Sequence, residues 1–191
     1  MAHGFKRTRK GIVGRFEAPE VRLLQKLFSD AGETLAPAAR EDGPARNDDP
    51  LEALLGWDEE VAEPTDPAVR RLLPAASSDP EQAAEFRRLT DRSLRERKTA
   101  ALRASSLALE SQPVVLSVAQ AQDFARSLND VRLVLASRLN IDSTEAAERV
   151  AELTDFGRAE DVEQYMGVVY NFVSWLQETL MNALLKTLPP W

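Results

Sequence analysis

The span from Glu81 to Gln112 constrains the fold of this chain more than any other feature, because it contains neither proline nor glycine. These two residues interrupt helices most strongly, so their absence permits one continuous helix of about 45 Å at about 1.5 Å per residue. Asp79-Pro80 stands directly before the span. Aspartate at the N-cap accepts a hydrogen bond from an unpaired amide, and proline fits the first helical position. The sequence therefore predicts a long helix from 80 to about 110.

The same Asp-Pro pair occurs twice more, at Asp49-Pro50 and Asp66-Pro67. Each pair predicts the start of a short helix, at about 50–56 and 67–73. The neighbouring segments are rich in proline, glycine and acidic side chains, which is typical of loops. We therefore predict flexible acidic loops at 37–49 and 57–66.

Apolar residues at steps of three and four predict three further core-facing helices, and a smaller helix begins at Ser143 or Thr144. Ser117 and Gln120 form a capping box that opens the second of the three. The apolar surface of the last helix is wider than one stripe, so it is either the central helix of a bundle or also a homodimer interface. The three helices span about 19–36, 118–139 and 160–187. The predicted core residues are Leu24, Phe28, Phe124, Leu128, Val131, Leu135, Val169, Phe172, Leu176 and Leu180.

The chain begins with two short extended runs, Phe5–Thr8 and Ile12–Phe16, separated by Arg9-Lys10-Gly11. Glycine can adopt the positive φ of a tight turn, so this segment is predicted to be a β-hairpin. Val114–Leu116 is a candidate third strand. The predicted fold is mainly α (α+β): a single domain over 1–191, in which a helical bundle carries an N-terminal β-hairpin.

Charge is distributed unevenly along the chain, whose formal net charge is -7. The stretch from Gly4 to Phe16 contains five bases and no acid. From Glu41 to Asp66 there are ten acids and one base, and from Phe86 to Arg103 seven bases and two acids. The molecule thus has two basic elements and one acidic segment.

Basic groups on a hairpin and on one helix face can neutralise phosphates. The alternative is that the acidic segment folds over the basic helix and each screens the other. Arg88, Arg92 and Arg95 are spaced by four and three, which places them on one side of the long helix. The candidate nucleic-acid-binding residues are Lys6, Arg7, Arg9, Lys10, Arg15, Arg88, Arg92 and Arg95.

Candidates for catalysis are few. The chain has no cysteine and one histidine, His3, which excludes a thiol switch, a thiolate metal site and a histidine-based cluster. No glycine-rich phosphate loop follows a strand, so we expect no enzyme activity, cofactor or metal. A small hydrolase with a carboxylate-held metal is the enzymatic alternative. Asn129, Asp130 and Arg132 are interpreted as an ion pair that fixes helix packing rather than as a binding site.

Two further expectations concern packing and location. Trp57 and Trp175 are expected to be packing groups rather than ligand stackers. No apolar run is long enough for a signal peptide or a membrane span, so we expect a soluble, cytoplasmic protein with no membrane partner.

Several blocks together resemble a known family. They are the basic hairpin with the helix around Glu20 and Leu24, then DPAVRRLLP, EFRRLT, SLNDVRLVLASRLNI and YNFVSWLQETLMNAL. This set is similar to the actinobacterial domain-of-unknown-function family DUF2017, which includes the oxidative stress transcription regulator AosR. The resemblance spans essentially the whole chain, and none of its blocks is a catalytic signature.

The resemblance implies a cytoplasmic transcription regulator that acts in stress or sulfur-metabolism gene control through DNA, a sigma factor or RNA polymerase. The alternative is a protein-interaction or adaptor module with no direct DNA contact. Disulfide-based redox sensing has been linked to the named regulator. This chain has no cysteine, so that mechanism does not transfer.

Overall fold

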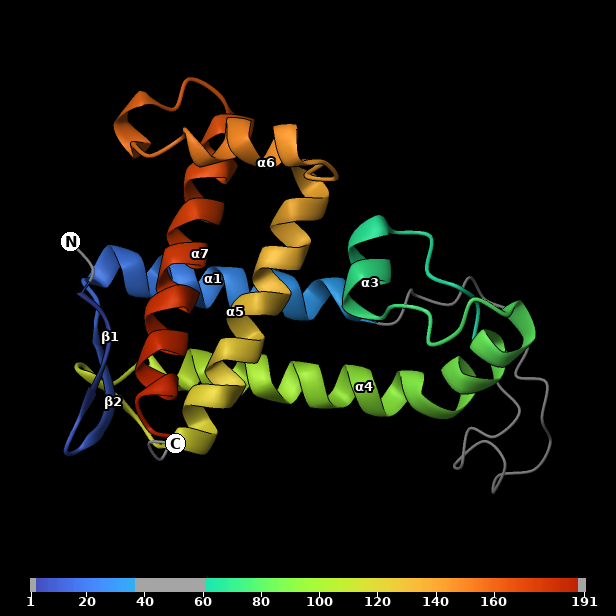
Figure 1. Cartoon of the computed structure of the whole chain (residues 1–191), viewed down its shortest axis with the longest axis horizontal. Coiled ribbons are helices and arrows are strands. Elements are labelled where there is room, and N and C mark those ends of the chain that lie inside the picture. The colour runs from blue at the N-terminus through green and yellow to red at the C-terminus, as the bar shows by residue number, and fades with distance from the viewer. Residues whose placement is uncertain (1–2, 37–60, 189–191) are drawn as a thin grey trace.

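The computed structural model describes residues 3–36 and 61–188, and these residues form a mainly helical fold with a small N-terminal antiparallel sheet (Figure 1). The predicted fold class is therefore confirmed. The predicted helix at 50–56, the loop at 37–49 and Trp57 lie outside the described residues. The described elements are β1 (His3–Thr8), β2 (Gly11–Arg15), α1 (Ala18–Thr34), α3 (Pro67–Leu72), α4 (Pro80–Ala108), β3 (Val114–Leu116), α5 (Val118–Arg138), α6 (Thr144–Ala151), a 3-10 turn (Phe156–Arg158) and α7 (Val162–Leu185).

The helices begin where their capping residues predict. The Asp66 carboxylate accepts a hydrogen bond from the Ala68 amide at 2.8 Å, and Asp79 accepts bonds from the amides of Glu81 and Gln82. At α5, Ser117 and Gln120 make both reciprocal bonds of a capping box. These signals were readable because each involves residues two or three apart in the chain.

The sheet has the order β1-β2-β3, and both pairings are antiparallel. The turn between β1 and β2 depends on Gly11, whose φ is +124° and whose absent Cβ would lie 2.6 Å from the Leu116 carbonyl oxygen. The free edge of β1 is covered by α7, because the Phe5 amide donates a hydrogen bond to Thr179 Oγ1 at 3.0 Å. This contact occupies part of the β1 edge and holds the hairpin against the helical body.

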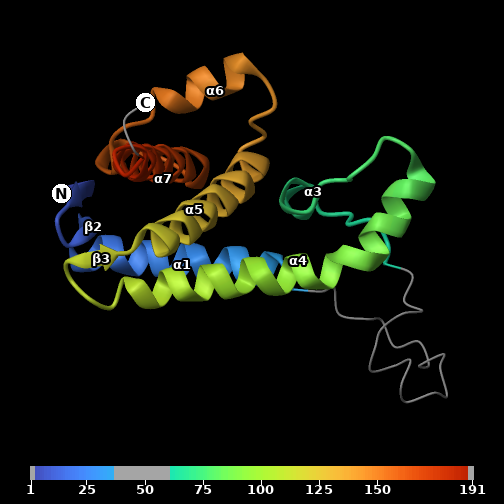
Figure 2. The ribbon, with the colours of Figure 1, turned by 60° about the horizontal axis from the view of Figure 1, so that its bottom comes forward.

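The helices form layers around α5. Figure 2 shows α1 and α4 side by side, with α5 crossing over them and α7 on the far side of α5. α5 also contacts α3 and the sheet. The central helix of the bundle is therefore α5, and α7 packs against one of its sides.

Nine of the ten predicted core residues are buried, and Phe172 is the exception. Phe172 is only partly buried and lies beside the half-exposed Trp175, with their ring centroids 6.1 Å apart. The inward stripe of α7 runs through Val169, Val173 and Leu176 instead. Phe172 is one position away from Val173 of this stripe, at the edge of the buried face. Because both residues are apolar and the apolar surface of the helix is wide, the sequence pattern could not show which of them points inward.

Alanine substitutions at two glycines test the turn geometry, because they should change the free energy of unfolding in opposite directions. Gly11→Ala should lower the free energy of unfolding by about 1–3 kcal/mol, because alanine rarely adopts this φ and its Cβ meets the Leu116 carbonyl. Gly32→Ala in α1 is the matched control. No atom lies within 4 Å of its added Cβ, so it should stabilise the protein by about 0.5–1 kcal/mol. Urea unfolding of both variants measures the difference, and equal effects would contradict the turn geometry.

Burial at two positions predicts different costs of truncation. Leu128 is fully buried on α5, so Leu128→Ala should cost about 2–5 kcal/mol. Phe172→Ala should cost clearly less, because its ring already contacts solvent. Thermal melts compare the two variants, and a larger loss at Phe172 would show that the outer face of α7 is covered in solution.

Candidate functional site

The hairpin presents all five of its predicted bases to solvent. Lys6 and Arg15 lie on the strands, Arg7 is near the tip, and Arg9 and Lys10 form the turn. None of them makes an ion pair with an acid in the part of the chain that the structure describes. The hairpin is therefore an exposed cationic surface whose charges no acid within residues 3–36 and 61–188 neutralises.

The two faces of the sheet differ in chemistry. Ile12 and Gly14 of β2 are buried against the core, so Val13 and Arg15 lie on the opposite, outer face. Lys6 is the cross-strand partner of Val13, and Val13 is in turn the partner of the half-exposed Val115. The outer face thus combines bases with short apolar side chains.

The three predicted bases of α4 have partners within their own helix. Arg88 binds Glu85 through two nitrogens, at 3.0 and 2.8 Å, and Arg92 binds Glu96 at 3.0 Å. Arg88 and Arg92 remain accessible, but their charges are largely compensated. The spacing of the arginines was visible in the sequence, and so were the acids one turn away that compensate them.

Arg95 has a structural position. Its side chain is 16% exposed, and it forms an ion pair with the equally covered Asp91 at 2.6 Å. A second nitrogen donates to the Leu35 carbonyl at 2.7 Å, at the C-terminal end of α1. A cation at a helix C-terminus is favourable because it satisfies free carbonyl groups. Arg95 therefore ties α4 to α1 and has little surface left for a phosphate.

The hairpin and the α4 arginines do not form one site. β3 follows the C-terminal end of α4 and pairs with the hairpin, whereas Arg92 lies roughly 16 residues, or about 24 Å, before that end. Figure 1 shows the hairpin at one end of the molecule and the first half of α4 toward the other. The hairpin is the stronger candidate for a nucleic-acid contact.

The polar residues of α5 bind the neighbouring helices. Asp130 is buried and accepts a hydrogen bond from Lys98 of α4 at 2.6 Å. Burial raises the pKa of the Asp130 carboxyl above its ordinary value, and the Lys98 ammonium opposes this shift. Arg132 donates to Ser174 and Gln177 of α7 at 3.0 and 2.9 Å. The interpretation as an ion pair that fixes helix packing holds for Asp130, whereas Arg132 bonds uncharged side chains of α7 and Asn129 lines a groove.

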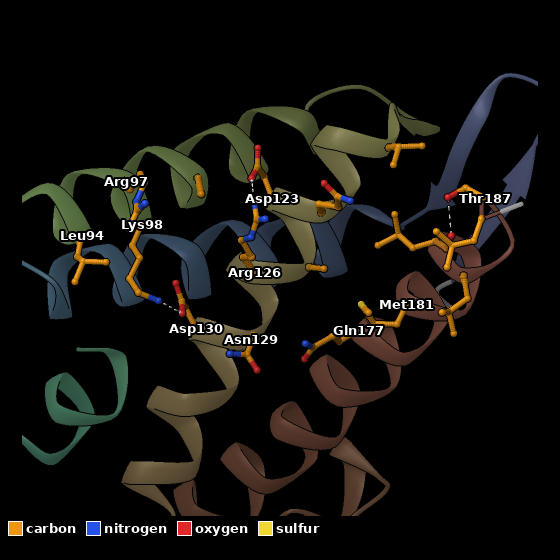
Figure 3. Close-up of a pocket in the computed structure, with 17 residues that line it drawn as sticks. Leu94, Arg97, Lys98, Asp123, Arg126, Asn129, Asp130, Gln177, Met181 and Thr187 are labelled. Atoms are coloured by element: carbon orange, nitrogen blue, oxygen red, sulfur yellow. Dashed lines mark hydrogen bonds and ion pairs between the residues drawn. The ribbon is translucent and has the colours of Figure 1, made fainter. Parts of the chain in front are cut away.

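A groove lies beside this network, where α4, α5 and the C-terminal end of α7 diverge (Figure 3). Its volume is about 950 Å³. Lys98 and Asp130 form part of its wall, and Asn129 and Gln177 face each other across it. The sequence did not predict this groove because its walls come from three helices that are distant in the chain. Its only signals were the wide apolar surface of the last helix and Arg97 in the basic run.

Two classes of feature are absent from the described residues. No group of three or more His, Cys, Asp or Glu side chains in 3–36 and 61–188 could hold a metal ion. Within the same ranges, no helix is both long and apolar enough to cross a membrane.

A family model described as a domain of unknown function, DUF2017, matches residues 2–184. No curated protein and no solved structure matches the chain.

The Lys98–Asp130 pair predicts a pH-dependent variant. Lys98→Met should cost up to about 3 kcal/mol at neutral pH, because it leaves a buried carboxylate unpaired. Burial raises the pKa of Asp130 in the folded state, so near pH 4 the acid is mostly protonated and needs no cation. The stability lost in Lys98→Met should therefore be small near pH 4 and should grow as the pH rises through this raised pKa. Unfolding of the variant and the native protein at each pH measures this difference. Adding Asp130→Asn should remove the pH dependence, and a cost independent of pH would contradict the assignment.

Proposed function

The chain belongs to the DUF2017 family, and we propose that it is a transcription regulator of the AosR type. It acts in the cytoplasm, in stress or sulfur-metabolism gene control, through DNA, through a sigma factor or RNA polymerase, or through both. The observation that carries the DNA contact is the hairpin, with five exposed bases that no described acid neutralises.

The geometry of the hairpin supports a contact with phosphates. A two-stranded ribbon is narrow enough to enter the major groove of DNA, and bases at its tip and outer face can neutralise the adjacent backbone. The Phe5–Thr179 hydrogen bond and the packing of Gly4 against Thr179 hold β1 to α7. A ribbon fixed in this way loses little conformational freedom on binding, so more of its electrostatic attraction contributes to affinity.

The second candidate function is a protein-interaction or adaptor module without direct DNA contact. It is favoured by exposed apolar side chains on α7, among them Val162, Trp175, Met181 and Leu185. Such side chains can hold a sigma factor, a polymerase subunit or a second copy of this chain through the 160–187 helix. Neither proposal assigns a catalytic role to any residue.

The DNA proposal predicts a large effect of neutralising the hairpin. A variant in which Lys6, Arg7, Arg9, Lys10 and Arg15 are all glutamine should bind a labelled mixed-sequence duplex more weakly. The slope of log affinity against log salt should also become shallower, by up to about 0.9 for each phosphate that the hairpin no longer neutralises. Fluorescence anisotropy across a salt series measures both quantities.

The control replaces Arg88 and Arg92 with glutamine, which removes bases that have intrahelical partners. Its effect on affinity should be small. Unchanged binding by the hairpin variant would remove the hairpin from the site. Failure of the native protein to bind even at low salt would favour the adaptor function.

A further inference from the structure

We propose that the groove between α4, α5 and the end of α7 binds an amphipathic helix of a partner protein, about three turns long, with an apolar face and an acidic flank. This inference goes beyond the DNA contact of the hairpin and uses a separate surface. It rests on the length of the groove, its apolar lining and its uncompensated cation.

The length of the groove fits a short helix. Along α5 its lining extends from Val118 to Asp130, which is about 18 Å at 1.5 Å per residue. Along the end of α7 it extends from Gln177 to Leu188. A helix of three turns is about 16 Å long, so it can lie between these walls and contact both.

Exposed apolar side chains gather in the groove. Val118, Met181, Leu185 and Leu188 line it and are 46%, 43%, 58% and 57% exposed. Ala101 and Ala125 also line it, and their small side chains leave room between the helices. Large apolar groups that share one concave surface mark an interaction site, because burying them against a partner releases water from all of them.

The charges of the groove indicate the chemistry of the partner. Both acids in its wall are already neutralised, Asp130 by Lys98 and Asp123 by Arg126, each at 2.6 Å. Arg97 is exposed and has no acidic partner among the residues that the structure describes. Among the described residues the groove therefore presents one uncompensated cation beside an apolar surface, which is complementary to carboxylates that flank an apolar helix face.

Polar donors lie between the apolar walls. The side-chain oxygen Oε1 of Gln177 accepts a hydrogen bond from Arg132, which leaves the side-chain nitrogen Nε2 of Gln177 for another partner. The Asn129 side chain makes no hydrogen bond within the described ranges, and Figure 3 shows it facing Gln177. The two amides can bind carboxylates or free helix carbonyls of the partner.

A second copy of this chain is a poorer fit than an acidic partner helix. Two grooves that face each other bring Arg97 of both copies to one interface. The exposed Phe86 and Leu89 of α4 lie beside Arg87, which forms no ion pair within the described residues, so this part of α4 would bring a second uncompensated base to the groove. A head-to-tail contact through another surface produces open chains rather than a closed assembly.

Two synthetic peptides test the proposal directly. Both are 15-residue fluorescein-labelled helices with leucines at positions i, i+4, i+7 and i+11; the other positions carry glutamate and alanine in one peptide, lysine and alanine in the other. The native protein should bind the glutamate peptide at least about tenfold more tightly than the lysine peptide. Equal affinity for both peptides, or no binding of the glutamate peptide up to millimolar protein, overturns the proposal.

Matched variants locate the binding. Leu185→Asp and Arg97→Glu should each weaken binding of the glutamate peptide by about tenfold, and Arg97→Glu should strengthen binding of the lysine peptide. The controls are Leu107→Asp and Arg92→Glu, which change exposed residues of α4 outside the groove. All four positions are exposed, and circular dichroism melts verify that each variant is folded. Equal losses in variants and controls would contradict the groove as the site.

Two further measurements separate this site from its alternatives. The glutamine-substituted hairpin should bind the glutamate peptide as tightly as the native protein does, whether or not it binds DNA. Sedimentation velocity reports self-association. An oligomer that Leu185→Asp dissolves and Leu107→Asp does not would make a second copy the occupant and overturn the assignment to a partner protein.

Discussion

The arrangement of the helices depends on the requirement that the buried polar groups of α5 find partners. Asp130 and Ser127 are buried, and a buried carboxylate or hydroxyl without a hydrogen bond is costly. Lys98 and Ser105 of α4 supply these partners, and the Arg132 bonds fix α7 on the other side. Apolar burial is not directional, whereas these hydrogen bonds form in one register of the helices. No buried polar side-chain atom in the described residues lacks a hydrogen-bond partner.

The groove is a consequence of this register. The bonds hold α4 and α7 against α5, and Ala101, which lies between Lys98 and Ser105 on α4, has only a methyl group to fill the space beside them. The same bonds neutralise Asp130 and leave Arg97 without a partner within the described ranges. One set of interactions thus determines both the shape of the groove and its residual charge, and a change of register would alter both together.

The features that were readable from the sequence are local. The caps of α3, α4 and α5 and the hairpin turn each involve residues a few positions apart, and the structure has them where the sequence predicts. Arg95 shows the limit of such reasoning, because its spacing suggested a surface role, whereas its Leu35 contact joins residues 60 positions apart. The hairpin bases were predicted by composition, but that none of them pairs with an acid in the described part of the chain is a tertiary property. The groove and the central place of α5 required knowledge of which helices meet.

The acidity of the chain and its basic hairpin are compatible because the two charges are separated along the sequence. Residues 37–60 contain eight acids and two bases, which accounts for six of the seven excess negative charges. The rest of the chain is therefore close to neutral, and the hairpin concentrates positive charge within it.

At physiological ionic strength charges more than about 8 Å apart are largely screened, so a phosphate at the hairpin responds to the nearest bases rather than to the net charge of the molecule. The negative net charge of the molecule weakens the long-range attraction of DNA. The hairpin is therefore best suited to contacts that form after another interaction has brought the DNA near. A groove that holds a second protein would provide that interaction, and the hairpin would then contribute through proximity.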